Sequence, residues 1–157
     1  MTMAMTVGKY LGDRDVSYEL YPHTHTPCSI QSAHAAHIPA DQLAKGVVVE
    51  DDDGYLMVVI PANCHVRFSW LRKATGRNVE LASELELAKL FEDCEVGAVP
   101  PLGDAYGMAT LIDDRLTEKP EIFFESGDHE ELVGMSSVDF MRLQPRAMHG
   151  QVASPMR

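Results

Sequence analysis

The chain has 157 residues, of which 13 are Lys or Arg and 24 are Asp or Glu, so its formal net charge is −11. This length fits one ordinary domain, and 45% hydrophobic with 24% charged residues is typical of a soluble globular protein. The composition excludes a disordered acidic protein, and no apolar run is long enough to span a bilayer. The acidic total argues against nonspecific coating of nucleic acid, but it leaves room for a local basic patch.

The periodicity of the apolar residues predicts a mixture of helices and strands. In chain order, the predicted elements are a helix (2–11), a strand (16–21), a helix (29–37), two strands (44–50 and 55–61), a helix (68–75), a short strand (79–82), a helix (84–91), three strands (108–112, 121–125 and 132–135) and a last helix (137–143). Because strands and helices are interspersed without a strict βαβ repeat, we expect an α+β fold.

Local signals mark the ends of several elements. We expect Ser29 and Ser137 to cap helices, and Asp53-Gly54 to turn a hairpin. Gly76 is placed to close a helix, and Ser83 with Glu86 forms a capping box. We expect one domain over residues 1–144 and, because few apolar residues follow, a flexible tail over 145–157.

Two features suggest the compartment. The first ten residues lack the basic start and apolar stretch of a signal peptide, so we expect a cytoplasmic protein. Cys28, Cys64 and Cys94 are far apart and form no C-x-x-C pair. They are therefore expected to be reduced and mostly buried thiols.

Basic charge is concentrated in one stretch. Residues 54–79 contain no Asp or Glu but include Arg67, Arg72, Lys73 and Arg77, which leaves 9 basic and 24 acidic residues for the rest of the chain. The stretch is either a phosphate-contacting patch on an otherwise repelling body or a solvated helix face.

Four histidines near the N-terminus allow a metal hypothesis. His23 and His25 are two apart, and His34 and His37 are three apart on a predicted helix, so each pair shares a face. Together they could converge on a transition metal. No carboxylate stands at ligand spacing, so exposed polar histidines are the favoured interpretation and no metal site is expected.

Lys45 and a glycine-containing loop are the other candidates. Lys45 opens an apolar strand, where its amine must either reach solvent or meet an anion. In the loop over 97–103, backbone amides could hold an oxyanion. Pro100 and Pro101 have no N–H, so the available donors are those of Gly97, Ala98, Val99, Leu102 and Gly103. A surface lysine and an ordinary helix–strand connection are the alternatives. The sequence has no G-x-S-x-G, Walker A or G-x-G-x-x-G motif.

These motifs, in this order, resemble the YbaK/ProX family of aminoacyl-tRNA deacylase domains, which are found free-standing or attached to prolyl-tRNA synthetase. The resemblance runs from about Tyr18 to Leu143. Its motifs are the segment 18–25 with the Ala-rich helix after it, Lys45 at the start of a hydrophobic strand, a Gly-x-x-x-Pro loop at 97–101, the strand end at 112–116 and the turn at 125–127.

The resemblance implies a mixed β-sheet curled into a small barrel with flanking helices. It also implies a trans-acting editing deacylase that hydrolyses the ester of a tRNA mischarged with a small amino acid, with help from a tRNA hydroxyl and without metal or other cofactor. The catalytic residues it implies are Lys45, Gly97, Ala98, Val99 and Pro101. The substrate-binding residues are His25, Arg67, Arg72, Lys73 and Gly103. The implied partners are the acceptor end of a mischarged tRNA and an aminoacyl-tRNA synthetase, with no membrane and no DNA.

Three positions depart from the family pattern. Gly46 stands where many members have Thr or Ser, Pro100 replaces a common Ser, and Leu102 replaces a common Phe. These departures concern the substrate more than the fold. They motivate an alternative, a non-catalytic module of the same fold that binds a nucleotide or aminoacyl-tRNA.

Overall fold

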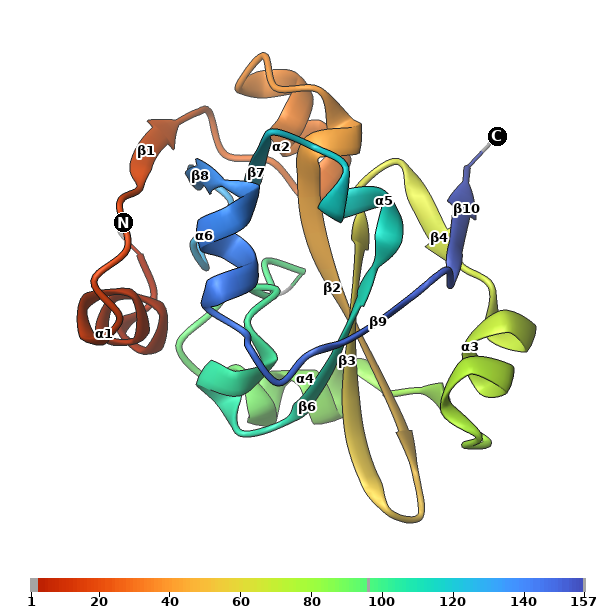
Figure 1. Cartoon of the computed structure of the whole chain (residues 1–157). Helices are drawn as coiled ribbons and strands as arrows, with labels where there is room; N and C mark the ends of the chain where they lie inside the picture. The colour runs from red at the N-terminus through yellow and green to blue at the C-terminus, as the bar shows by residue number, and fades with distance from the viewer. Residues whose placement is uncertain (1–2, 96, 157) are drawn as a thin grey trace.

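The computed structural model describes residues 3–95 and 97–156, whose helices and strands follow one another in mixed order (Figure 1). The helices are α1 (Met5–Asp13), α2 (Ser29–Ala35), α3 (Phe68–Thr75), α4 (Glu84–Leu90), α5 (Asp114–Thr117) and α6 (Ser137–Arg142), with 3-10 turns η1 (Ala40–Gln42) and η2 (Gly103–Tyr106). The strands are β1 (Glu19–Pro22), β2 (Leu43–Asp51), β3 (Gly54–Pro61), β4 (Cys64–Val66), β5 (Glu80–Leu81), β6 (Ala109–Asp113), β7 (Glu121–Glu125), β8 (Glu131–Ser136), β9 (Met148–Gly150) and β10 (Ala153–Pro155). No helix among the described residues is long and apolar enough to cross a membrane.

The main sheet is mixed, with the strand order β1-β8-β7-β2-β3-β6-β9, and β5 pairs with the far end of β2. Neighbouring strands β2 and β3 form the antiparallel hairpin, while β6 and β7 pair with them in parallel. A separate ribbon joins β4 to β10. The expected single α+β domain with a mixed sheet and flanking helices is confirmed. Within the described part of the chain, the end strands β1 and β9 do not pair with each other.

The β2–β3 hairpin separates two hydrophobic clusters, because successive side chains of a strand point to opposite faces. Val48 and Met57 belong to the larger cluster, which also contains Val99 and α6. The side chains of Val47 and Val49 lie with Leu71 of α3 in a second cluster. The central hairpin is therefore buried on both faces, and each face is packed against a different set of helices and loops.

Helix α1 packs against segments that lie far away in sequence. The amide of Ala4, which precedes the helix, donates to the carbonyl of Ser126 at 2.8 Å, and the amide of Thr6 donates to the carboxylate of Asp93 at 2.9 Å. A Cβ atom added to Gly127 would lie 2.8 Å from the Cβ of Ala4, so the turn after β7 and the start of α1 are in close contact. The N-terminal segment thus holds two loops together.

Most local predictions are confirmed and two caps are wrong. The hairpin, the closure of α3 by Gly76 at φ +68° and the capping box of Ser83 with Glu86 all occur as predicted. Helix α2 is preceded by Cys28 instead of being capped by Ser29. The α6 cap is Ser136, whose Oγ accepts from the amide of Asp139 at 3.1 Å, and Ser137 is the first helical residue. The helix start predicted at residue 2 lies outside the described residues.

The segment expected to be a flexible tail contains the strands β9 and β10. Its order depends on a residue distant in sequence: the buried carboxylate of Asp113 accepts from the amides of Val152 and Ala153 at 2.9 and 3.0 Å. Val152 is fully buried. One acidic side chain at the end of β6 therefore supplies the partner that fixes the turn between the two strands.

Candidate functional site

Lys45 lies near the start of β2 and is half-buried. Its amine donates to the carbonyl of Ala62 at 3.4 Å and forms no salt bridge within the described residues. Burial lowers the pKa of Lys45, because the charged amine loses hydration, and the nearby thiols of Cys64 and Cys28 oppose that shift. The protein thus keeps a partly desolvated cation without supplying a carboxylate for it.

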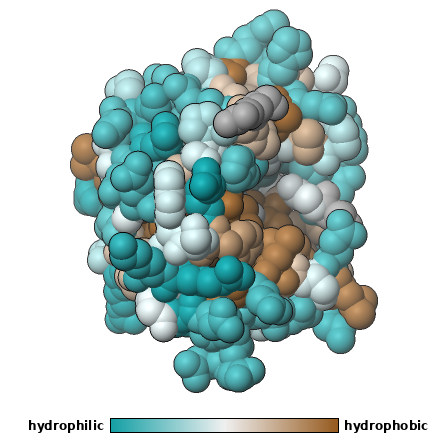
Figure 2. Space-filling model, turned by 90° about the vertical axis from the view of Figure 1, so that its right-hand side faces the viewer, coloured by the Kyte–Doolittle hydropathy of each residue, from teal (hydrophilic) through white to brown (hydrophobic). Residues whose placement is uncertain are grey.

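The face of β2 that carries Lys45 is also the face covered by α3. Val47, Val66 and Phe68 are partly buried hydrophobic residues packed against the cluster on this face. Figure 2 views the molecule from the side of α3, β4 and β10, and it shows a hollow with a hydrophobic floor and a polar rim. An apolar hollow with a few polar groups is the usual form of a small-ligand site.

The loop at 97–101 approaches the neighbouring position of β2 from the other face. A Cβ atom added to Gly46 would lie 3.3 Å from Cγ1 of Val99 and 3.2 Å from Sδ of Met57. Along the edge of β2 that faces away from β3, β7 pairs at Leu43 and Ala44 and β5 pairs at Val49 and Glu50. Gly46, which the loop contacts, lies in the stretch between these two pairings, where that edge has no partner strand. The absence of a side chain at position 46 permits this close approach.

The residues before α2 lie between Lys45 and the loop. Cys28 is an electrostatic neighbour of Lys45, and a Cβ atom on Gly97 would lie 3.5 Å from the carbonyl oxygen of Pro27. Gly97 is exposed and has φ +82°, a conformation that favours glycine. The segment at 27–28 therefore lies near both Lys45 and Gly97, while Val99 contacts Gly46 from the other face of β2.

The loop supplies fewer free amides than its sequence suggested. The amide of Ala98 donates to the carbonyl of Glu95 at 3.0 Å, so it is not available to bind an oxyanion. Ala98 and Pro101 are buried, and the carbonyl of Pro101 accepts from the side-chain amide of Gln144 at 3.1 Å. The amides of Gly97 and Val99 donate no hydrogen bond to another described residue, so they are the remaining donors.

Gly103 has a packing role. It is buried at the start of η2, where an added Cβ atom would lie 2.0 Å from Oγ1 of Thr110 and 3.1 Å from the carbonyl oxygen of Met108. Such a short separation requires glycine, because any side chain would collide with β6. The predicted contact of Gly103 with a substrate has no support in this position.

His25 and a histidine that sequence reasoning did not select meet beside Gly97. Nε2 of His25 lies 2.7 Å from Oε1 of Glu95, and the His25 ring lies edge-on to that of His129, with centroids 6.0 Å apart. Nδ1 of His129 lies 2.7 Å from Oε2 of Glu125, and a Cβ atom on Gly97 would lie 3.3 Å from Nε2 of His129. A buried histidine–carboxylate pair therefore lies directly behind the loop.

The turn that carries His129 is strained but well held. His129 has φ +58° and Gly127 has φ +125°. The carboxylate of Asp128 accepts from the amide of Glu130 at 2.9 Å, which fixes the turn from within. The sequence signal that could have found His129 is a histidine four residues after a glutamate that ends a buried strand.

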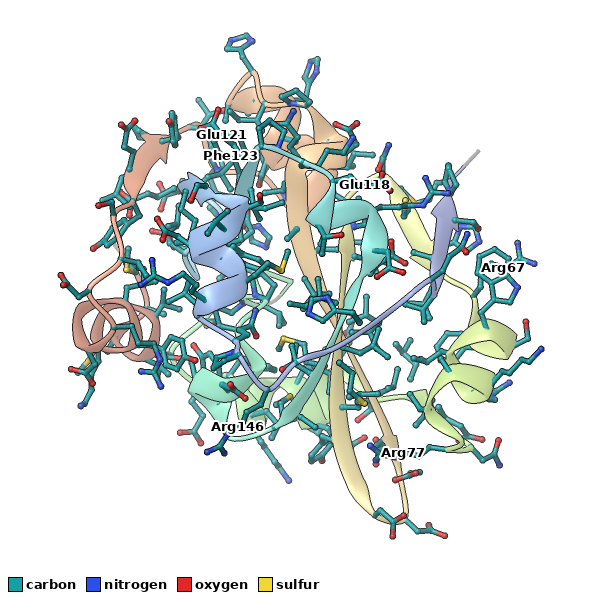
Figure 3. The ribbon with its side chains drawn as sticks, viewed as in Figure 1. Arg67, Arg77, Glu118, Glu121, Phe123 and Arg146 are labelled. Atoms are coloured by element: carbon teal, nitrogen blue, oxygen red, sulfur yellow. The ribbon has the colours of Figure 1, made fainter. Side chains whose placement is uncertain are left out.

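The basic stretch is only partly available for a ligand. Figure 3 shows Arg67 on the α3 side and Arg77 beside the β2–β3 hairpin. The Arg67 guanidinium lies over the Trp70 ring at 4.9 Å. Arg77 donates to both carboxylate oxygens of Asp51, at 2.7 and 2.8 Å, and these bonds lower the pKa of Asp51 to about 2. Arg77 is therefore structural.

The two other basic residues on α3 differ in their freedom. Nε of Arg72 donates to the carbonyl of Val79 at 3.2 Å, and its guanidinium lies 5.5 Å from the centroid of Phe68. Lys73 is exposed and lines a shallow cleft of about 350 Å³ with Trp70. Arg67 and Lys73 are thus the cations on α3 with most freedom to contact an anion.

The histidines of the metal hypothesis are not gathered into one site. His25 is paired with Glu95, and Nδ1 of His23 lies 2.7 Å from the carbonyl of Thr24. His34 and His37 are exposed. Within the described part of the chain, no group of three or more His, Cys, Asp or Glu side chains is arranged to hold a metal ion.

Comparison with known proteins adds a family to this geometry. Residues 22–143 match the family model of the aminoacyl-tRNA editing domain. The chain belongs to this family. The match takes in Lys45, the loop at 97–101 and His129, while α1, β9 and β10 flank the matched part of the editing domain. The predicted resemblance is confirmed at the level of the family. No curated protein matches the chain.

Solved structures share the fold of this editing domain. The crystal structure of hypothetical protein APE2540 has a TM-score of 0.83 at 20% identity, covering 95% of this chain and 99% of that one. A protein described as a candidate trans-editing enzyme for prolyl tRNA synthetase has a TM-score of 0.81 at 18% identity, with 96% of each chain covered. A candidate signal transduction protein from Marinobacter aquaeolei VT8 has a TM-score of 0.78 at 21% identity, covering 97% of this chain and 31% of that one. At these identities the likeness shows the fold alone.

Proposed function

We propose that this editing domain acts in trans on a mischarged tRNA and hydrolyses the ester that joins a small amino acid to the tRNA acceptor end. The observation that carries the proposal is the half-buried amine of Lys45, which has no salt-bridge partner within the described residues. A desolvated cation is costly unless an anion compensates it, and a tRNA end supplies phosphate. A charge-assisted bond of this kind contributes about 1.5–3 kcal/mol.

The chemistry requires water, an ester and a site that stabilises negative charge. Water adds to the ester carbonyl carbon, the bond to the ribose oxygen breaks, and the free amino acid and the tRNA hydroxyl are released. The loop amides of Gly97, which is exposed, and of Val99, which is half-buried, would donate to the oxygen on which charge develops. Each such donor contributes about 10²–10³ in rate. A neighbouring ribose hydroxyl would help to activate the water.

His129 would position this loop. Its ring lies behind Gly97 and is fixed by the buried carboxylate of Glu125 at 2.7 Å. Burial of both side chains beside each other leaves the ring little freedom to change its orientation. We therefore assign His129 as a positioning residue of the site, with His25 and Glu95 closing its outer side.

The close packing beside β2 supports the proposed preference for small amino acids. Val99 and Met57 approach the Cα of Gly46 so closely that an added Cβ atom would lie 3.2–3.3 Å from them. A hydrophobic site discriminates by about 1–3 kcal/mol for one methylene group, and a second sieve of this kind corrects errors that the synthetase makes. Alanine, serine and cysteine are the side chains of suitable size.

The test is a deacylation panel with alanyl-, seryl- and cysteinyl-tRNA, measured as release of amino acid. We expect wild type to release at least one of them, and Lys45→Ala to do so about 10- to 100-fold more slowly, since it loses a charge-assisted bond. Lys89→Ala, on the exposed side of α4, is the matched control. No release from any of the three, or equal rates for wild type and Lys45→Ala, would overturn the proposal. Binding of aminoacyl-tRNA without turnover would instead favour the non-catalytic module.

A further inference from the structure

A second basic cleft lies where the end of α1 meets the end of α6 and the start of β6. Its volume is about 770 Å³, which is within the range of small-molecule sites. Three arginines line it: Arg14 after α1, Arg142 at the end of α6, and Arg146 in the following loop. Figure 3 shows Arg146 at the lower left and Arg67 at the right, and none of the residues that line the cleft belongs to α3, to β2 or to the loop at 97–101. The cleft is therefore separate from α3 and from the site around Lys45.

The charges of this cleft are largely uncompensated. Within the described residues, neither Arg14 nor Arg146 forms a salt bridge, and Arg142 forms only an exposed one with Asp139 at 3.2 Å. Asp104 is the one carboxylate among the residues that line the cleft. Arg14 and Arg146 are thus left without a salt bridge to a described residue, in a chain whose net charge is −11.

Arg14 is held in place before any ligand arrives. Its guanidinium carbon lies 3.5 Å from the centroid of the Tyr10 ring, which also lines the cleft. The Tyr10 hydroxyl donates to the carbonyl of Leu143, so the ring itself is fixed. A stacked guanidinium loses less freedom on binding than a solvated side chain does.

We propose that this cleft binds a phosphate group. Guanidinium groups match phosphate oxygens in charge and in bidentate geometry, and a concave basic surface concentrates the potential that attracts an anion. The net charge of the chain is −11, so a concave group of arginines is a local exception on a largely acidic molecule. This proposal does not depend on the deacylase activity.

The test titrates pyrophosphate into the full chain by calorimetry. We expect wild type to bind, and the double variant Arg14→Gln with Arg146→Gln to bind at least tenfold more weakly. The matched control is Lys9→Gln with Lys89→Gln, which removes the same charge from exposed positions outside the cleft and should stay within twofold of wild type. Arg146→Gln alone removes no salt bridge within the described residues, and serves if the double variant fails to fold.

Two further measurements identify the source of the phosphate. The affinity for uncharged tRNA is compared between wild type and the double variant. An equal loss for tRNA and pyrophosphate supports the RNA backbone as the occupant, while an unchanged tRNA affinity with lost ADP binding supports a small phosphorylated molecule. If wild type binds no pyrophosphate, or if the lysine control weakens binding as much as the arginine variant, the proposal is overturned.

Discussion

The Nδ1 atom of His129 lies 2.7 Å from Oε2 of Glu125, and the two side chains are 1% and 2% exposed. The pair spans the turn after β7 and places the other side of the histidine ring against Gly97. A carboxylate buried this deeply is tolerated only with a partner, since removal of one member leaves the other without compensation. The geometry of the loop and the stability of the domain are therefore coupled here.

Replacement of Glu125 by Ala should lower the free energy of unfolding by about 3–5 kcal/mol, because it breaks a buried pair. Urea denaturation measures this loss. Glu125→Gln keeps the size of the side chain and should retain more stability while still slowing deacylation, because its amide no longer orients the ring as a carboxylate does. Glu130→Gln, at a half-buried neighbour, is the control and should change neither property much. Similar losses for Glu125→Ala and Glu130→Gln would contradict a special role for the pair.

Lys45→Met should raise the melting temperature at neutral pH while it slows deacylation about 10- to 100-fold, as Lys45→Ala does. Burial lowers the folded-state pKa of Lys45, so the protonated amine opposes folding at every pH below that lowered pKa. Between the lowered pKa of the folded state and the ordinary pKa of the unfolded state, the folded protein releases its Lys45 proton while the unfolded chain still holds it. The stability of wild type therefore rises with pH over this range, toward that of Lys45→Met. Melting curves from pH 7 to pH 10.5 should therefore converge. A melting temperature below that of wild type at pH 7 would show that the amine is satisfied within the fold.

Arg77→Ala should destabilise the hairpin without weakening tRNA binding. The bonds from Arg77 lower the pKa of Asp51 to about 2, so the pair contributes its full stability above the ordinary pKa of an aspartate. That contribution disappears as pH falls toward about 2, where Asp51 is protonated even in wild type. Melting temperatures of the variant and wild type should differ at pH 7 and converge at pH 2. Filter binding at pH 7 should show a loss for Arg67→Ala with Lys73→Ala, and no loss for Arg77→Ala.

Gly46→Ser should shift the choice of amino acid toward the smallest side chain. The added atoms would stand 3.2–3.3 Å from Met57 and Val99 before relaxation, and so occupy space that we assign to the substrate. We expect the ratio of alanyl- to cysteinyl-tRNA hydrolysis to rise roughly tenfold, within the range that one methylene group provides. Gly150→Ser is a matched control, because nothing lies within 4 Å of a Cβ atom there. An unchanged ratio for Gly46→Ser would remove position 46 from the specificity site.

Local signals in the sequence were sufficient for much of the fold. The Asp53-Gly54 turn and the capping box at Ser83 depend only on residues close in the chain, and both form as predicted. The strands at the C-terminus could not be predicted in this way. They depend on the carboxylate of Asp113, which is about 40 residues away and whose bonds to Val152 and Ala153 require the finished fold.

The residues of the candidate site could likewise be predicted only in part. Lys45 could be selected from sequence, because a lysine at the start of an apolar strand is unusual wherever the strand packs. The pairing of His129 with Glu125 has a signal in their four-residue spacing, but the contact of His129 with Gly97 could not be predicted, since it arises when β7 and the loop meet in the fold. The charge of Arg77 was misleading for a similar reason: its partner Asp51 is 26 residues away, and the composition of one stretch does not show which charges are already paired.

The contact between Ala4 and the turn at 126–127 connects the start of the N-terminal helix to the segment that carries His129, although the two are far apart in sequence. That helix lies outside the span matched by the family, yet it braces the loop from which His129 projects. An editing domain excised at the borders of the matched span would keep every residue of the candidate site and lose the support behind it. A change in this flanking segment can thus alter the position of His129 while the residues of the candidate site stay the same.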